Sequence, residues 1–319
     1  MERTLGVDHG TQGLRFCLLD GHNQRFFEIK REQAAKASIL KGLGEKGFLD
    51  VDLVGLTYSM ADAITAITDV KKLRNRGQVT RVTGEFLGGG TRLFDEIQSC
   101  GIRAVLIPGL HRGISCLDER FKLLYSHMAA SEKVALAYHA FNLINKEMRA
   151  EELVIADISS NTVTIGIKKA RFFGAIDACL GAPGLLHGPL DMGLIRDVDE
   201  GKTTANKAFY RGGMAQKSRR SPEDILKGRD EKARLALDSL LLAVEMEVLG
   251  FASVLAPQAI AVSGSAGIHE NMFPKLKEAF KGVAPVFKLN AFAAAIGAAE
   301  IARDMLKGKG DFLGIGVDV

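Results

Sequence analysis

Two aspartates in this sequence each stand directly before a short turn of small and polar residues. Asp8 is followed by Gly10, Thr11, Gln12 and Arg15, and Asp157 is followed by Ser159, Ser160, Asn161 and Thr162. The backbone N–H groups of a tight turn point into one concavity that can bind phosphate oxygens, and glycine lets a ligand approach closely. A carboxylate repels phosphate but can bind Mg²⁺, which then bridges to a nucleotide. The pattern indicates two phosphate-binding turns, with Asp8 and Asp157 as metal ligands and catalytic residues. A single turn of this kind is also typical of a plain β-hairpin.

A third segment, Ala259 to Gly267, combines a buried strand with a loop of small residues. The candidates for contact with a nucleoside in this loop are Ser263, Gly264, Ser265 and Gly267. Such a loop would let an adenine ring or a ribose lie flat on the backbone. The alternative is a close-packed turn between a strand and a helix.

Arg112 is the third catalytic candidate. It follows His111 just after a predicted strand, where ligands gather in open α/β sheets. A histidine there could act as an acid or base near neutral pH, and an arginine could neutralise developing phosphoryl charge. A solvated turn is the alternative. Asp62 could accept a proton from an acceptor hydroxyl, but we favour a role as a helix cap.

Two glycine-rich segments are further candidates. Gly84 to Arg92 precedes a predicted helix and could form an anion site or a hinge, but no lysine follows at the spacing of a Walker loop. Gly181 to Arg196 is unusually rich in glycine and proline, which is typical of a functional loop. Its candidate polar groups are His187, Asp191 and Arg196. The polar segment 201–220 after it is expected to be mobile.

The elements that would position these residues repeat along the chain. Each half should begin with a three-stranded meander, at 4–7, 14–19 and 25–30 in the first half and at 153–156, 163–168 and 170–176 in the second. The strand at 103–107 and the helix at 131–148, which Ser131 would cap, match the strand at 259–262 and the helix at 289–306. Another strand is expected at 53–57, and helices are expected at 33–42, 62–70 and 93–100. This order predicts an internal duplication and a mixed α/β fold with helices on both faces of the sheet.

The order of these motifs resembles the actin-like ATPase superfamily, which includes acetate kinases, sugar kinases, actin and the heat-shock ATPases. Its first phosphate motif is similar to Asp8–Arg15, its second to Asp157–Thr162 and its adenosine motif to Val262–Gly267. In the second motif the usual glycines are replaced by Ser159 and Ser160. The resemblance implies a duplicated ribonuclease-H-like fold with ATP and Mg²⁺ bound in a cleft between two lobes. The first lobe would be 1–130, with 304–319 packing back on it, and the second 131–303. Within the superfamily, DHGTQGLRFC and DISSNTVTIGI most resemble an archaeal family counted among methanogenesis marker proteins.

Composition narrows the class of protein. With 319 residues, 47% hydrophobic and 25% charged, the chain is typical of a globular protein. Its net charge of +4 is small and dispersed, so we expect no nucleic-acid partner and no membrane partner. None of the four cysteines forms a C-x-x-C pair and the start shows no signal peptide, so we expect a cytoplasmic protein. No His-x-x-x-His occurs, which counts against the iron-binding tRNA-modifying branch of the superfamily.

The sequence thus predicts an ATP- and Mg²⁺-dependent phosphotransferase that acts on a small carboxylate or hydroxyl acceptor. The alternative is a nucleotide-driven assembly factor or sensor, linked to archaeal methanogenesis, whose state a partner protein detects. A third hypothesis is a degenerate relative that binds no nucleotide. A homodimer is left open.

Overall fold

The computed structural model describes residues 2–10, 13–21, 23–34, 38–58, 61–73 and 89–319, with only the backbone described at 89–91. The candidates Thr11 and Gln12 and the segment 84–88 lie outside the described residues. The chain divides into two compact units. Unit 1 contains 1–143 and 292–319, and unit 2 contains 144–291. The predicted second lobe, 131–303, therefore includes two helices that lie mostly in unit 1.

Unit 1 is built on an eight-stranded mixed sheet with the order β14-β15-β5-β6-β4-β1-β2-β3. Its strands are β1 Arg3–Gly10, β2 Gly13–Asp20, β3 Asn23–Lys30, β4 Leu53–Thr57, β5 Ile67–Asp69, β6 Ala104–Ile107, β14 Asp311–Phe312 and β15 Ile315–Asp318. Strands β1 to β3 form an antiparallel meander, and β4 and β6 run parallel to β1. The carboxyl ends of β1, β4 and β6 consequently lie at one edge of the sheet. A separate ribbon pairs β7, Leu110–His111, with β8, His127–Ala129.

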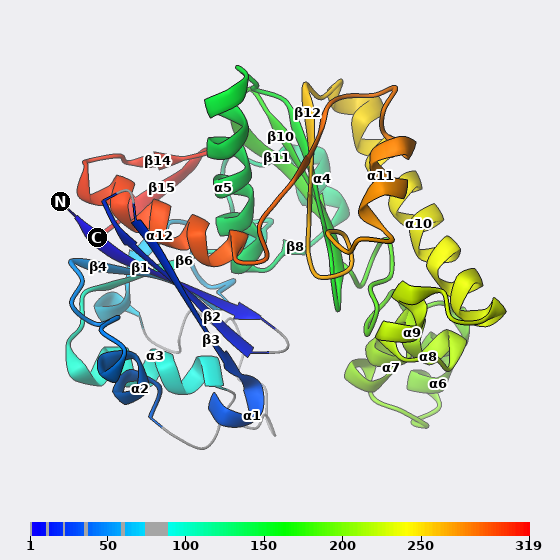
Figure 1. Cartoon of the computed structure of the whole chain (residues 1–319), viewed down its shortest axis with the longest axis horizontal. Coiled ribbons are helices and arrows are strands. Elements are labelled where there is room, and N and C mark those ends of the chain that lie inside the picture. The colour runs from blue at the N-terminus through cyan, green and yellow to red at the C-terminus, as the bar shows by residue number, and fades with distance from the viewer. Residues whose placement is uncertain (1, 11–12, 22, 35–37, 59–60, 74–88) are drawn as a thin grey trace. The chain divides into compact units, whose positions relative to one another are not determined.

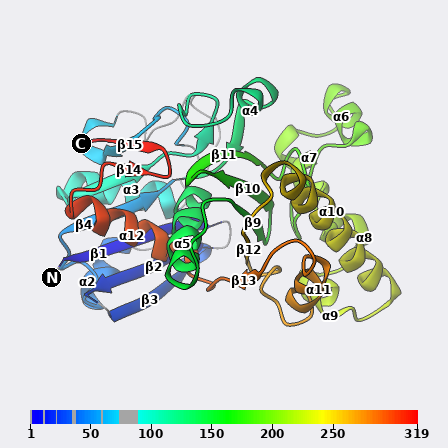
Figure 2. The same cartoon turned by 90° about the horizontal axis from the view of Figure 1, so that it is seen from above.

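Strand alternation gives this sheet two apolar faces. Leu5 and Val7 of β1 face a core that includes α2, Ile39–Glu45, and α3, Gly89–Cys100. Cys17 and Leu19 of β2 face α12, Ala293–Leu306, on the other side. Figure 2 shows β1, β2 and β3 side by side, with α12 running across them. The prediction that helices cover both faces is confirmed for this sheet.

Helix α12 is packed tightly enough that glycine is required where it meets its neighbours. A Cβ on Gly6 of β1 would lie 1.9 Å from the carbonyl oxygen of Ala295, and one on Gly55 of β4 would lie 2.1 Å from that of Ala298. On its opposite side, a Cβ on Gly297 would lie 1.8 Å from the carbonyl oxygen of Ala135 in α5, Ser131–Glu147. All ten residues from 293 to 302 are buried. The alanine-rich sequence is therefore what lets α12 fit between a sheet and a second helix.

Unit 2 repeats the strand arrangement of unit 1 in a five-stranded sheet with the order β11-β10-β9-β12-β13. Its strands are β9 Leu153–Ile158, β10 Thr162–Lys168, β11 Arg171–Ile176, β12 Ala259–Ser263 and β13 Val286–Lys288. The meander β9–β10–β11 and the parallel strands β12 and β13 correspond to β1–β2–β3, β4 and β6. The duplication is thus present, but the predicted match of the strand at 103–107 with that at 259–262 is wrong. The partner of β12 is β4, because each is the parallel neighbour of the first strand of its meander.

Helices make up much of the rest of unit 2. The longest of them is α10, Glu231–Leu255, a 25-residue helix drawn in yellow in Figure 1. Its Phe251 and Leu255 side chains pack against the backbone of Gly166 in β10. The shorter helices are α6 Met192–Asp199, α7 Ala205–Arg211, α8 Met214–Ser218, α9 Pro222–Lys227 and α11 Phe273–Ala279. Segment 201–220, predicted to be a mobile polar segment, instead contains α7 and α8.

Three predicted elements of unit 1 differ from the structure. The helix predicted at 62–70 is wrong, because Ile67 and Thr68 lie in β5, which pairs with β6 and β15. The helix predicted at 33–42 is wrong as one element: α1 is Arg31–Ala34, and Ser38 caps a new helix, α2, by accepting the Lys41 N–H. Ser131 does not cap α5, because its hydroxyl donates to the Tyr58 carbonyl and accepts the Tyr58 N–H. The remaining short helices of unit 1 are η1 Val70–Lys72 and α4 Glu119–Leu124.

Candidate functional site

Asp8 lies near the carboxyl end of β1, on the face of the sheet that α12 covers. Asp8 is 5% exposed and lies directly opposite Arg15 of the antiparallel strand β2. A Cβ on Gly10 would lie 3.9 and 4.0 Å from the two carboxylate oxygens of Asp8. A side chain at this position would therefore make only ordinary van der Waals contact with the carboxylate. The Arg15 guanidinium contacts Glu28 at 3.3 Å and lies 6.0 Å from the centre of the Phe292 ring.

Thr57 fixes the end of β1 to the end of β4. Its hydroxyl donates to the Val7 carbonyl at 2.9 Å and accepts the His9 N–H at 3.0 Å. The His9 ring stacks on Tyr58, with centroids 5.8 Å apart. Burial, and secondarily the charge of Arg31, lowers the pKa of His9 to about 4, so this ring is neutral near pH 7.

Unit 2 places Asp157 in the equivalent position. Asp157 is 4% exposed and pairs with Ser263 of the parallel strand β12. In unit 1, Asp8 likewise lies on a strand whose parallel neighbour, β4, ends in Thr57. The carbonyl of Ile158 accepts the N–H groups of Ala266 and Gly267, at 3.0 and 2.9 Å. Gly264 has φ +83°, and a Cβ there would lie 2.3 Å from the Ile158 carbonyl oxygen. Unit 2 therefore brings the second predicted turn and the predicted adenosine loop together.

The turn after Asp157 is held by residues 181–188, which we call the strap. The strap's N–H groups bind the turn's carbonyls: Leu185 donates to Ser159 at 2.9 Å, and Leu186 and His187 both donate to Ser160 at 3.0 Å. The Thr162 hydroxyl donates to the Pro183 carbonyl at 2.7 Å. The Thr162 side chain, which we predicted to contact phosphate, is thus buried against the strap.

These contacts determine where the turn's own N–H groups point. In a trans peptide the C=O of one residue and the N–H of the next point in opposite directions. Because the strap binds the carbonyls of Ser159 and Ser160, the N–H groups of Ser160 and Asn161 point away from it. Neither N–H group has an acceptor among the described residues. Two consecutive N–H groups without acceptors form the kind of nest that binds an anion.

Glu247 of α10 anchors the other end of the strap. Its carboxylate accepts the Ala182 N–H at 2.6 Å, and a Cβ on Gly181 would lie 2.0 Å from the same oxygen. Burial raises the pKa of Glu247. The strap is therefore fixed at both ends, to α10 by a carboxylate and to the turn after Asp157 by four hydrogen bonds. The sequence marked the strap as a functional loop but did not indicate Glu247, because nothing in a helical sequence shows which loop it will meet.

The other candidates in this loop have local structural contacts. His187 stacks on Phe209, with centroids 4.8 Å apart, and burial lowers its pKa. Asp191 caps α6 by accepting the N–H groups of Gly193 and Leu194. The Leu194 N–H, and then the charge of Lys217, lower the pKa of Asp191. Arg196 is exposed on α6.

The ribbon β7–β8 holds two histidines directly opposite each other, His111 and His127. His111 is 7% exposed; its Nδ1 accepts the Gly113 N–H at 3.1 Å, so its Nε2–H donates to the Ile64 carbonyl at 2.9 Å. Both ring nitrogens of His111 are therefore used structurally. Arg112 directly follows β7, in the turn after that strand, and is exposed.

His127 instead pairs with Asp62, its Nδ1 lying 2.9 Å from the carboxylate Oδ2. The two side chains are 29% and 28% exposed. A Cβ on Gly109, just after β6, would lie 3.1 Å from Asp62 Oδ1, so glycine lets the carboxylate approach the end of this strand. Asp62 caps no helix, in contrast to our expectation. The sequence did not indicate His127, because its pairing with a residue 65 positions away depends on where the unpredicted strand β8 lies.

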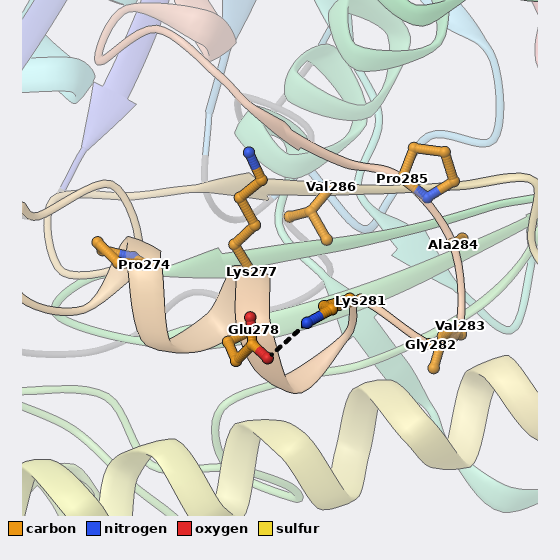
Figure 3. Close-up of a pocket in the computed structure, with 9 residues that line it drawn as sticks. All are labelled: Pro274, Lys277, Glu278, Lys281, Gly282, Val283, Ala284, Pro285 and Val286. Carbon is orange, nitrogen blue, oxygen red and sulfur yellow. Dashed lines mark hydrogen bonds and ion pairs between the residues drawn. The ribbon is translucent and has the colours of Figure 1, made fainter.

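A cavity of about 500 Å³ lies elsewhere in unit 2 (Figure 3). It is lined by Pro274, Lys277, Glu278, Lys281, Gly282, Val283, Ala284, Pro285 and Val286. Val286 pairs with Ile260 near the start of β12, whereas Ser263 is at the end of that strand. The cavity is therefore at the opposite end of the strands from the candidate adenosine loop, and Lys281 is paired with Glu278 at 3.0 Å.

No three His, Cys, Asp or Glu side chains of the described chain gather as they would around a metal ion. Within the same residues, no helix has the length and apolar character needed to cross a membrane.

Comparison with solved structures identifies the fold. A propionate kinase from Francisella tularensis matches with a TM-score of 0.65 at 9% identity, over 95% of this chain and 100% of that one. An acetate kinase from Porphyromonas gingivalis matches with a TM-score of 0.62 at 12% identity, over 96% and 100%. A ROK family glucokinase from Streptomyces griseus matches with a TM-score of 0.56 at 15% identity, over 95% and 99%. The predicted actin-like fold is confirmed.

No family model matches the chain. The UPF0285 protein of Methanocaldococcus jannaschii is 44% identical over 99% of this chain and 99% of its own length. The UPF0285 protein of Methanothermobacter thermautotrophicus is 40% identical over 99% of this chain and 98% of its own length. The expected resemblance to an archaeal family is confirmed, and the chain belongs to the UPF0285 family, whose members matched here come from methanogens.

Proposed function

We propose that this protein is an ATP- and Mg²⁺-dependent phosphotransferase. The observation that carries the proposal is the second turn, where the strap orients two N–H groups without acceptors next to Asp157 and the small-residue loop after β12. The proposal is also supported by Asp8, which occupies the equivalent position in the duplicated sheet of unit 1. A neighbour of the same fold, the Streptomyces griseus glucokinase, is described as a complex with glucose and AMPPNP.

The described residues of each turn, taken by itself, fit a magnesium nucleotide. Asp8 and Asp157 supply the oxygen ligands that Mg²⁺ prefers, and Mg²⁺ usually binds through one or two carboxylates plus water and phosphate. At the second turn, Asn161 Oδ1 is buried with no hydrogen-bond partner among the described residues. Rotation of that amide by half a turn would present its NH₂ group instead, adding a donor to those of the backbone.

Each unit's residues have a definable role toward the nucleotide. The N–H groups of Ser160 and Asn161 would bind phosphate oxygens, and the loop 263–267 would support the nucleoside. Bound Mg²⁺ would supply positive charge to a transferring phosphoryl group. The loss of glycine at Ser159 and Ser160 is compensated by the strap, which holds the turn in place from outside. The degenerate, non-binding alternative is therefore disfavoured.

Titration of Mg²⁺–AMPPNP into the protein tests this proposal. We expect binding that is lost in EDTA, and we expect Asp157→Asn and Asp8→Asn each to weaken it by at least about 10-fold, or 1.4 kcal/mol. Asparagine has nearly the same shape as aspartate, so both variants should keep the wild-type unfolding midpoint. Asp197→Asn is the matched control, because Asp197 pairs with Arg211 at 2.8 Å and belongs to neither turn. Wild-type affinity in both turn variants would show that the aspartates do not hold the metal.

A further inference from the structure

The long helix α10 of unit 2 is apolar on two opposite faces. One face, which includes Leu237 and Val244, is buried on the side where α10 packs against β9, β10, α8, α9 and α11. The opposite face carries four large apolar side chains, which we call the outer stripe: Leu235, Leu242, Met246 and Leu249, which are 66%, 59%, 68% and 41% exposed. Their spacings of seven, four and three residues keep these side chains on one side of a helix with about 3.6 residues per turn.

The outer stripe does not have the composition of a helix face that meets water. A helix at the surface of a globular protein carries charged and polar side chains opposite its core face, and a helix that is apolar all round is buried. The last eight residues of α10, 248–255, include no charged residue. No described residue of the chain covers the stripe, because its four side chains are at least 41% exposed. The stripe is therefore a docking surface for another molecule.

The order of residues along the stripe favours a second copy of this chain as the partner. Leu235 and Leu249 each lie seven residues from Leu242, so the three leucines have the same spacing from either end. When two such helices pack antiparallel with Leu242 at the centre, Leu235 of one copy meets Leu249 of the other at both ends. A two-fold interface needs a self-complementary surface of this kind. The antiparallel arrangement also brings opposite ends of the two helix dipoles together.

The charges beside the stripe fit the same register. Asp238 and Glu245 lie seven residues apart on one flank of it, and Asp238 is paired with Lys275 of α11 at 3.3 Å. Glu245 has no ion-pair partner among the described residues. In an antiparallel pair each flank faces the same flank of the other copy, so Glu245 comes next to the other copy's Asp238. The lysine already held there supplies the positive charge that Glu245 lacks.

We infer that the protein forms a homodimer by antiparallel pairing of α10 through the outer stripe. This inference is independent of the proposed function, because neither turn contributes to the stripe. A helix of 25 residues is about 37 Å long and about 10–12 Å wide, so each copy covers roughly 400 Å² in projection. A standard interface buries about 800 Å² on each partner. The dimer should therefore dissociate in the micromolar range.

Sedimentation velocity of the full chain, from below to above the micromolar range, tests the dimer. The wild type should pass from monomer to dimer. Leu242→Glu places two like charges opposite each other at the two-fold axis, so this variant should stay monomeric at every concentration, with an unchanged circular dichroism spectrum. Leu123→Glu is the matched control, because Leu123 is 86% exposed on α4 of unit 1 and lies outside the stripe. A wild type that is monomeric throughout, or a dimer that survives Leu242→Glu, would overturn the proposal.

Crosslinking tests the register without a variant that breaks the dimer. Leu235→Cys and Leu249→Cys are each made in a chain whose exposed Cys100 and Cys179 are replaced by serine. With a short bis-maleimide, a mixture of the two variants should give a covalent dimer, and each variant alone should give only background. Self-crosslinking of Leu235→Cys as strong as that of the mixture would show a parallel pair and overturn the antiparallel register. A dimer that gives no crosslink in either experiment would show that another surface forms it.

Discussion

At the scale of single residues, the turn after Asp157 shows how the conformation of a turn can be fixed without glycine. Ser159 and Ser160 stand where the superfamily motif usually has glycine. Their carbonyls are bound by three N–H groups of the strap, and these contacts replace conformational freedom as the determinant of where the turn's N–H groups point. Glycine is instead required in the strap, because a Cβ on Gly184 would lie 2.3 Å from the Ser160 carbonyl oxygen.

Gly184→Ala should therefore weaken nucleotide binding. The added methyl group displaces the turn, and we expect the Kd of Mg²⁺–AMPPNP to rise about 10-fold. Calorimetric titration checks this. Gly193→Ala is the control, because its Cβ would meet its nearest neighbour, Asp191, at an ordinary 3.4 Å. Equal affinities in the two variants would mean that the strap does not position the turn.

The sequence predicted candidate residues better than it predicted their partners. The turns after Asp8 and Asp157 could be recognised because aspartate, small residues and flanking apolar strands are adjacent along the chain. Their actual roles at the sites are still predictions. His127 and Glu247 were not predicted, because each acquires its role from a residue far away in sequence, Asp62 and Ala182. No local pattern contains that information.

At the scale of elements, α12 is the most constrained part of unit 1. It contacts β1 and β4 through Gly6 and Gly55 on one side and α5 through Gly297 on the other. Each contact brings backbone against backbone. Helices that approach this closely have no room for an added carbon atom, because protein interiors are close-packed.

Gly297→Ala is expected to destabilise the protein by about 1–3 kcal/mol or more, since the new methyl group would overlap the Ala135 carbonyl. Gly250→Ala in α10 is the matched comparison. A Cβ there meets nothing within 4 Å, so the higher helix propensity of alanine should add about 0.5–1 kcal/mol. Denaturant unfolding midpoints of the two variants should move in opposite directions. A destabilised Gly250→Ala together with an unaffected Gly297→Ala would contradict the packing described for α12.

Elements with strong local patterns were predicted correctly, and those decided by tertiary contacts were not. Both meanders and the alanine-rich helices were found, although each strand of β1 to β3 is longer than expected. Residues 62–70 have helical spacing, yet Ile67 and Thr68 pair with β6 and β15 in the sheet. Pairing with β15 joins positions 250 residues apart, such as Ile67 and Val317, which no window of sequence can reveal.

At the scale of the whole molecule, the buried carboxyl of Glu247 should affect stability as a function of pH. Burial raises its pKa in the folded state above the value in the unfolded chain. The folded protein therefore binds the Glu247 proton more tightly than the unfolded chain does. The free energy of unfolding gains most from this group below about pH 4.3, the ordinary pKa of glutamate. That gain is lost as the pH rises through the raised pKa of the folded state.

Glu247→Gln should remove this loss. The variant keeps an oxygen that can accept the Ala182 N–H but carries no charge at neutral pH, so its unfolding midpoint at pH 7 should exceed that of the wild type. The difference should vanish towards pH 4. Thermal unfolding followed across pH 4 to 8 measures it, with the exposed Glu278→Gln as control. A difference between variant and wild type that is independent of pH would show that charge is not the cause.

The placement of α12 and β15 in unit 1 also bears on the order in which a growing polypeptide can complete its structure. Unit 2 is continuous in sequence, from 144 to 291, whereas unit 1 needs 292–319 to cover the α12 face of its sheet and to add β15. During translation, residues 1–143 of unit 1 are made before α12 exists, so the glycines of β1 and β4 that contact α12 stay uncovered. Unit 2 does not depend on any segment made after residue 291. We therefore expect unit 2 to be able to complete its fold before unit 1, whose sheet of β1 to β4 keeps an uncovered apolar face until 292–319 is made.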